Sequence, residues 1–147
     1  MTEESYSLTV TSDVANLGTV IDLVTQAAQK ASLDEQDIRS VQMAVDEACI
    51  NIMVHAYADA AGDIHLHCQV RPGECIITLC DHGRPFDPES VPSPDVTSDL
   101  KGRRVGGLGL YFMRKLMDEV RFSFDRDKGN QVVMIKRGKP SRQEGSG

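Results

Sequence analysis

Strict alternation of apolar and polar residues over positions 63–70 constrains the fold of this chain most strongly. The apolar members are Ile64, Leu66, Cys68 and Val70, and the polar members are Asp63, His65, His67 and Gln69. A repeat of two residues predicts a β-strand with one buried face. A turn at 71–74 and an apolar run from Cys75 to Cys80 follow, so we expect an antiparallel hairpin.

The segments before this hairpin carry the repeat of amphipathic helices. After a short strand at 6–10, a helix is predicted to about residue 31, from apolar residues at Leu17, Ile21, Val24 and Ala28. A second helix, about 35–57, has two apolar stripes on nearly opposite sides. One stripe contains Val41, Ala44, Val45, Ala48 and Ile52, and the other contains Met43, Ile50 and Val54. A helix with two apolar sides is expected to be sandwiched between other elements.

The segment after the hairpin starts with a long stretch that has little periodicity. It contains four prolines, namely Pro85, Pro88, Pro92 and Pro94. Long loops without secondary structure are more often functional than idle, so residues of about 84–105 are predicted to form a lid. A third helix is predicted to open at Gly106. A strand at 120–125, a hairpin turn at 127–130 and a last strand at 131–136 complete the chain.

This order of elements predicts an α+β fold, β-α-α-β-β-loop-α-β-β. The expected architecture is a two-layer sandwich with a mostly antiparallel mixed sheet and its helices on one face. We expect a single domain over residues 1–137 and a flexible polar tail over 138–147.

Composition and charge exclude several functions. The net charge of −6 argues against direct, sequence-independent binding to nucleic acid or to an anionic membrane, since both require an excess of Lys and Arg. No apolar run approaches the roughly 20 residues that span a bilayer. The acidic N-terminus lacks the features of a signal peptide, so we expect a cytoplasmic protein.

The cysteines and two of the histidines leave alternatives open. Four cysteines without a C-x-x-C pair are expected to be reduced and mostly buried, and a metal or redox role is the other interpretation. His65 and His67 share one strand face, which is either the polar face of a sheet or a zinc-binding H-x-H pair. The sequence gives no mechanistic role for His55.

A helical pair and a strand end carry polar groups suited to a nucleotide. The chain has no P-loop motif, and it lacks the H-R-D and D-F-G motifs of eukaryotic-type kinases. Glu47 and Asn51 are four residues apart in a predicted helix, so they share one face, either as solvated surface residues or as a base and a magnesium ligand. Asp81 ends a buried strand, where its carboxylate can accept a hydrogen bond from the amine of adenine, and Gly83 lets the backbone approach the base.

A glycine cluster supplies a candidate phosphate site. Gly106, Gly107 and Gly109 stand at the start of the third predicted helix, where backbone N–H groups and the helix dipole favour anions. Arg104 lies just upstream, either within reach of a triphosphate or as part of a solvated lid. The cluster could also be only a helix cap.

Together these segments resemble the three sequence boxes of the gyrase and histidine kinase (GHKL) ATPase superfamily. The matching segments are Glu47-x-x-x-Asn51, Asp81-x-Gly83-x-Pro85 and Gly106-Gly107-Leu108-Gly109-Leu110. Within the superfamily the chain most resembles the bacterial anti-sigma factor serine/threonine kinases. Pro85 replaces the second glycine of the usual D-x-G-x-G box, which stiffens the lid entrance and removes no side-chain ligand.

The resemblance implies a Bergerat-type site for ATP and Mg²⁺. By position, Glu47 would be the catalytic base, Asn51 the magnesium ligand and Asp81 the adenine contact. Gly83 would support the adenine ring, and Gly107, Leu108 and Gly109 would line the phosphates.

The resemblance also implies partners. Such proteins sequester a sigma factor and phosphorylate a Ser or Thr of a small anti-anti-sigma protein with a STAS domain, usually as homodimers. The alternative is an ATP-binding regulatory module of a partner-switching system without kinase activity. The sequence names neither the target nor the phosphoacceptor residue.

Overall fold

Five strands and three main helices make up the described part of the chain. The computed structural model describes residues 3–57, 61–85 and 105–138, with the backbone alone described for 105–109. In chain order, the elements are β1 (Glu4–Thr11), the 3₁₀ helix η1 (Val14–Asn16), α1 (Leu17–Lys30), α2 (Glu35–Ile50), the π-helix η2 (Asn51–Ala56), β2 (Asp63–Arg71), β3 (Glu74–Asp81), α3 (Val105–Leu116), β4 (Glu119–Asp125) and β5 (Gly129–Arg137).

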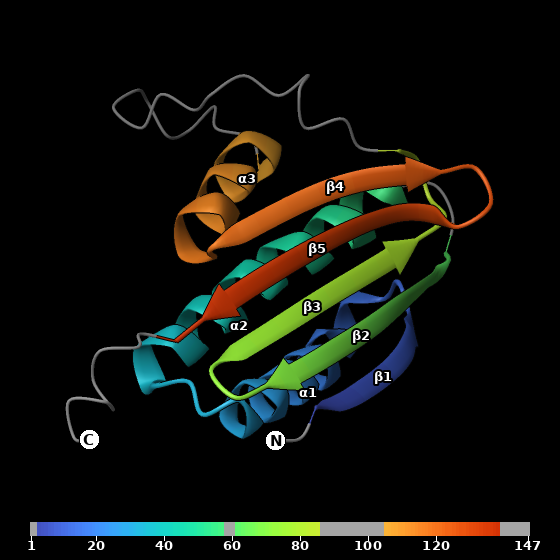
Figure 1. The fold of residues 1–147 in the computed structure, drawn as a ribbon. Helices are drawn as coiled ribbons and strands as arrows, with labels where there is room; N and C mark the ends of the chain where they lie inside the picture. The colour runs from blue at the N-terminus through green and yellow to red at the C-terminus, as the bar shows by residue number, and fades with distance from the viewer. Residues whose placement is uncertain (1–2, 58–60, 86–104, 139–147) are drawn as a thin grey trace, which may run out of the picture.

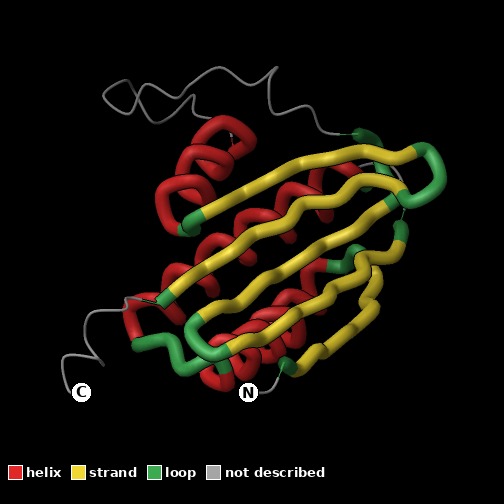
Figure 2. The backbone as a smooth tube through the Cα atoms, viewed as in Figure 1, coloured by secondary structure: helices red, strands yellow, loops and turns green. Residues whose placement is uncertain are grey.

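The elements form two layers, as the sequence predicts. The sheet has the strand order β1-β2-β3-β5-β4, and its helices cover one face (Figures 1 and 2). Every pairing between the described strands is antiparallel, so the sheet is antiparallel throughout rather than mixed. The α+β two-layer sandwich is therefore confirmed.

The predicted hairpin of β2 and β3 lies near the middle of this sheet. Leu66 pairs with Leu79 across it, and burial alternates along both strands, which confirms the period of two. Gly73 sits in the connecting turn with a φ of 79°, a conformation that glycine adopts without a steric penalty. β3 begins at Glu74, one residue inside the predicted turn, and ends at Asp81 as expected.

The last hairpin differs from the prediction. The expected turn at 127–130 is shorter, because Gly129 and Asn130 already belong to β5. Asn130 pairs directly with Asp81 at the end of β3. The carboxyl end of β3 and the amino end of β5 therefore bring two polar residues together.

Helix α1 packs its small apolar face on the sheet and ends at a defined cap. Its buried residues are Val20, Val24, Ala27 and Ala28. Leu33 donates its N–H to the carbonyl oxygen of Ala28 (3.2 Å), and Ser32 donates to Gln29 (3.0 Å). This is a Schellman motif, with Ser32 at a φ of 65° in the position that usually holds glycine. Asp34 then caps α2 by accepting the N–H of Asp37 at 2.8 Å.

The second predicted helix is found at the expected residues, but its last part is a π-helix and only one of its two apolar stripes is buried. Its first stripe is buried against the rest of the core, as expected. Its second stripe is wrong as a buried face, because Met43 is 56% and Val54 48% exposed. From Asn51 the α-helix continues as a π-helix, which closes with a bond from the N–H of Tyr57 to the carbonyl oxygen of Ile52 (3.0 Å).

The core is one cluster of apolar side chains between the helices and the sheet. Three of the cysteines, Cys49, Cys68 and Cys75, are fully buried in it, and all four cysteines are free thiols. Ring nitrogens of His65 and His67 bond the hydroxyls of Thr9 (2.9 Å) and Ser7 (3.0 Å) on the neighbouring strand. None of the described helices combines the length and apolar character that a membrane crossing requires.

The cysteines yield a prediction about thiol reactivity. Burial raises the pKa of Cys49, Cys68 and Cys75 to about 12, so almost no thiolate exists at neutral pH. Cys80 is only partly buried. Under native conditions we expect a maleimide reagent to label Cys80 alone, and all four thiols to react in denaturant. Rapid native labelling of Cys49, detected by peptide mass spectrometry, would contradict the burial described here.

Candidate functional site

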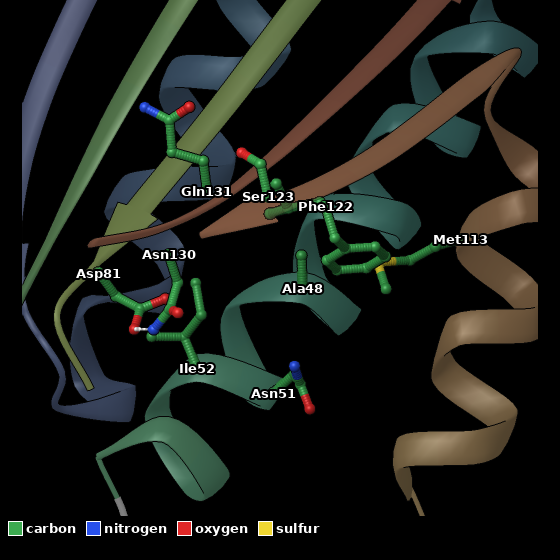
Figure 3. Close-up of a pocket in the computed structure, with 10 residues that line it drawn as sticks. Ala48, Asn51, Ile52, Asp81, Met113, Phe122, Ser123, Asn130 and Gln131 are labelled. Carbon is green, nitrogen blue, oxygen red and sulfur yellow. Dashed lines mark hydrogen bonds between the residues drawn. The ribbon is translucent and has the colours of Figure 1, made fainter. Parts of the chain in front are cut away.

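A cavity opens where α2 and η2 face the ends of β4 and β5. Its empty volume is about 380 Å³, part of it open to solvent. The lining residues are Ala48, Asn51, Ile52, Asp81, Met113, Phe122, Ser123, Asn130, Gln131 and Val132. Figure 3 shows apolar side chains along the walls, with Asp81 and Asn130 at one end and Asn51 on the helix side. Such a mixture suits a flat apolar ligand that carries a few polar groups.

Asp81 is the buried polar group at one end of this cavity. It is 4% exposed, because β3 lies inside the sheet and its inward-facing positions include residue 81. Its Oδ1 accepts the backbone N–H of Gly83 at 2.9 Å and the amide of Asn130 at 2.8 Å. Two donors therefore fix the orientation of this carboxylate within the site, and Figure 3 shows the bond from Asn130.

Asn130 belongs to the site, and sequence reasoning missed it. Its Nδ2 donates to Asp81 and to the carbonyl oxygen of Gly83 at 3.1 Å. A Gly-Asn pair between strands is a common turn signal, and this signal hid the residue's place at the start of β5. A polar residue immediately before the alternating last strand is the only sequence feature that could have indicated it.

Gly83 lies directly against the end of the π-helix. A Cβ atom at residue 83 would stand 2.4 Å from the carbonyl oxygen of Ala56, which is too close for any other residue. The same carbonyl accepts the N–H of Arg84 at 2.9 Å. Gly83 is therefore needed for a close approach between two backbones, rather than for an unusual φ angle.

Tyr57 anchors the same junction from the other side. Its hydroxyl accepts the backbone N–H of His82 at 2.7 Å and donates to the carbonyl oxygen of Asp63 at 2.9 Å. Gly62 lies against the tyrosine ring, where a Cβ would come within 2.1 Å of a ring carbon. The ends of η2 and β3 and the start of β2 are thus held at one point.

Glu47 and Asn51 occupy successive turns of the helix. The N–H of Asn51 bonds the carbonyl oxygen of Glu47, so the expected one-turn spacing is present. Asn51 faces the cavity that contains Asp81. Glu47 instead lines a neighbouring cavity of about 370 Å³, together with Met43, Asp46, Phe112 and Leu116. The structure therefore brings Asn51 and Asp81 together and places Glu47 beside them.

The environment of Glu47 alters its acidity. Burial raises the pKa of this carboxyl above its ordinary value, and the negative charge of Asp46 raises it further. Partly buried carboxylates with a raised pKa are characteristic of acid–base groups, although structural ones also occur.

The remaining predicted site residues are described only in part. Gly106, Gly107, Leu108 and Gly109 lie in the first turns of α3, which begins at Val105, close to the predicted start. Arg104 and most of the predicted lid, residues 86–104, lie outside the described residues, as does the tail from 139. Within the described ranges, no three His, Cys, Asp or Glu side chains gather as a metal cluster.

Comparison with known proteins identifies the class of this fold. Residues 10–136 match the histidine kinase-like ATPase domain family. A serine-protein kinase RsbW from Bacillus licheniformis is 38% identical over 116 residues, which cover 74% of this chain and 70% of the relative. Another RsbW, from Halalkalibacterium halodurans, is 31% identical over 137 residues, covering 90% and 83%.

A solved structure has the same fold. The crystal structure of the RsbU and RsbW domains of a Mycobacterium tuberculosis protein superposes with a TM-score of 0.64 at 18% identity, covering 91% of this chain and 32% of that one. The chain belongs to the histidine kinase-like ATPase domain family and, within it, to the RsbW-related serine-protein kinases.

The close contact at Gly83 predicts that an added side chain at this position destabilises the fold. Gly83→Ala should lower the free energy of unfolding by about 1–3 kcal/mol, because the added methyl group collides with the Ala56 backbone. Urea unfolding measures this change.

The matched control is Gly18→Ala in α1, where an added Cβ meets no atom within 4 Å. That change should raise stability by up to about 1 kcal/mol through helix propensity. Equal effects of the two substitutions would show that residue 83 is not tightly enclosed.

Proposed function

We propose that this protein is an ATP-dependent serine/threonine kinase whose site lies between α2, β3 and α3. The observation that carries the proposal is the pairing of Asp81 and Asn51 in one cavity, with Glu47 one helical turn away. Membership of the histidine kinase-like ATPase family supports it.

The buried end of the cavity fits the base of ATP. Asp81 offers a carboxylate oriented by Gly83 and Asn130, which can accept a hydrogen bond from the exocyclic amine. Ile52, Val132 and other apolar lining residues provide surfaces for the flat ring. Gly83 supports this end by its close contact with η2.

The opposite end suits phosphates and a magnesium ion. Because α3 begins at Val105, the backbone N–H groups of Gly106 and Gly107 fall in its first turn, where they have no intrahelical acceptor and favour anions, and Leu108 and Gly109 follow directly. Arg104 is proposed to add positive charge there. The Asn51 carboxamide oxygen would hold Mg²⁺, which prefers oxygen ligands, and a bound Mg²⁺ would neutralise phosphate charge.

Glu47 is the proposed general base. Its carboxylate would take the proton of the attacking Ser or Thr hydroxyl. The hydroxyl oxygen forms a bond to the γ-phosphorus as the bond to the bridging oxygen of ADP breaks. Because burial and Asp46 raise the pKa of Glu47, its carboxylate is a stronger base than that of an exposed glutamate.

The proposed partners follow from the family resemblance. The hydroxyl would belong to a small anti-anti-sigma protein with a STAS domain, and the kinase itself would sequester a sigma factor. We further propose a cytoplasmic homodimer. The relatives named serine-protein kinases support the reaction, since their names state that they act on serine.

Substitution of Glu47, the proposed general base, should separate the binding of ATP from the transfer of its phosphate. Glu47→Gln should lower the rate of phosphate transfer to a cognate STAS partner about 10²- to 10⁴-fold. Binding of Mg-ATP by isothermal titration should change little, because Glu47 lies outside the cavity that contains Asp81.

Three outcomes would point elsewhere. Transfer at the wild-type rate by the Glu47 variant would disprove the base assignment. Binding of ATP by the wild type without transfer to any partner would favour a regulatory ATP-binding module. No binding of Mg-ATP by the wild type would exclude both the kinase and the regulatory ATP-binding module.

The neighbouring carboxylate predicts a pH effect. Asp46 raises the pKa of Glu47 by charge repulsion, so Asp46→Asn should lower that pKa. The base is active when ionised, and the transfer rate of the variant should therefore persist to lower pH than that of the wild type. Single-turnover rates across the acidic range measure this shift. A shift to higher pH would contradict the assignment of Glu47.

A further inference from the structure

Asn130 has a buried oxygen that the proposed function does not use. The residue is 9% exposed, and its Oδ1 has no hydrogen-bond partner among the described residues. Buried polar atoms in folded proteins are nearly always hydrogen-bonded. Because Asn130 also lines the cavity, a donor from a bound molecule is the natural partner for this oxygen.

The orientation of the Asn130 amide is fixed by its surroundings. Its Nδ2 lies 2.8 Å from Asp81 Oδ1, 3.1 Å from the Gly83 carbonyl oxygen and 3.4 Å from that of Arg84. Backbone carbonyl oxygens only accept hydrogen bonds. A flipped amide would set its oxygen against these acceptors, so Oδ1 must be the atom that is turned away from Asp81 (Figure 3).

Asp81 and Asn130 therefore present two acceptors side by side. They are direct neighbours across the β3 and β5 pairing, and both line the same end of the cavity. We propose that Asn130 Oδ1 accepts a hydrogen bond from the exocyclic amine of the nucleobase, which donates its other hydrogen to Asp81. This assignment rests on the proposed binding of ATP at this site.

Two acceptors at one point make Asn130 a specificity-determining residue. A 6-aminopurine has two amine hydrogens and can satisfy both oxygens. A purine without the 6-amino group donates to neither side chain and leaves Asn130 Oδ1 without a partner, and a 6-oxopurine brings a third acceptor against them. Sites built to bond a particular donor reject analogues that lack it, because their own buried polar groups stay unpaired.

A thermodynamic cycle with the full chain tests the assignment. Isothermal titration would compare ATP with purine riboside triphosphate, which has hydrogen in place of the 6-amino group, for the wild type, Asn130→Leu and Asn130→Ser. The preference for ATP should fall about tenfold in both variants, the size of one lost hydrogen bond. Asn130→Ser keeps a donor for Asp81 and covers the case in which the leucine variant fails to fold.

The matched control is Gln69→Leu on β2. The Gln69 amide bonds the Glu3 carboxylate, and Gln69 does not line the cavity of Asp81 and Asn130, so its loss should leave the preference for ATP unchanged. An unchanged preference in folded Asn130 variants, with both ligands weakened equally, would overturn the assignment and leave Asn130 as a residue that positions Asp81. Failure of the wild type to bind ATP would instead overturn the proposed function itself.

Discussion

The contact between Gly83 and the Ala56 carbonyl joins the two halves of the candidate site. One half is the end of β3, which carries Asp81, and the other is the helix that carries Asn51. The N–H of Arg84 bonds the same carbonyl, and the Tyr57 hydroxyl accepts the N–H of His82, so backbone groups and one tyrosine side chain hold the two halves together. The backbones of Gly83 and Ala56 come so close that no Cβ atom fits between them. This junction therefore sets the distance between the end of β3 and the helix.

The π-helix makes that junction possible. A π-helical turn contains more residues than an α-helical one, and such turns occur frequently at functional sites. Here the π-helix begins at Asn51, directly after the α-helix that positions Glu47. The proposed base therefore sits on regular helix, whereas the proposed metal ligand sits where the helix changes its geometry to meet β3.

Helix α3 forms a wall of both cavities next to these residues. Met113 lines the cavity of Asp81, and Phe112 and Leu116 line the cavity of Glu47. A movement of α3 would alter both cavities at once. In the proposed kinase, the same helix would also supply the phosphate-binding N–H groups, so nucleotide binding would be linked to the surroundings of Glu47.

The sequence by itself determined the alternating strands, the amphipathic helices and the positions of Glu47 and Asp81, because these depend on residues near each other in the chain. Only the tertiary structure decided which helix faces are covered, and it leaves Met43 exposed on a stripe that looks buried. It also decided the contact of Asn130 with Asp81, which lies 49 residues away. That contact depends on the register between β3 and β5. Because α3 and β4 separate these two strands in the chain, no hairpin turn fixes their register, and the packed sheet sets it.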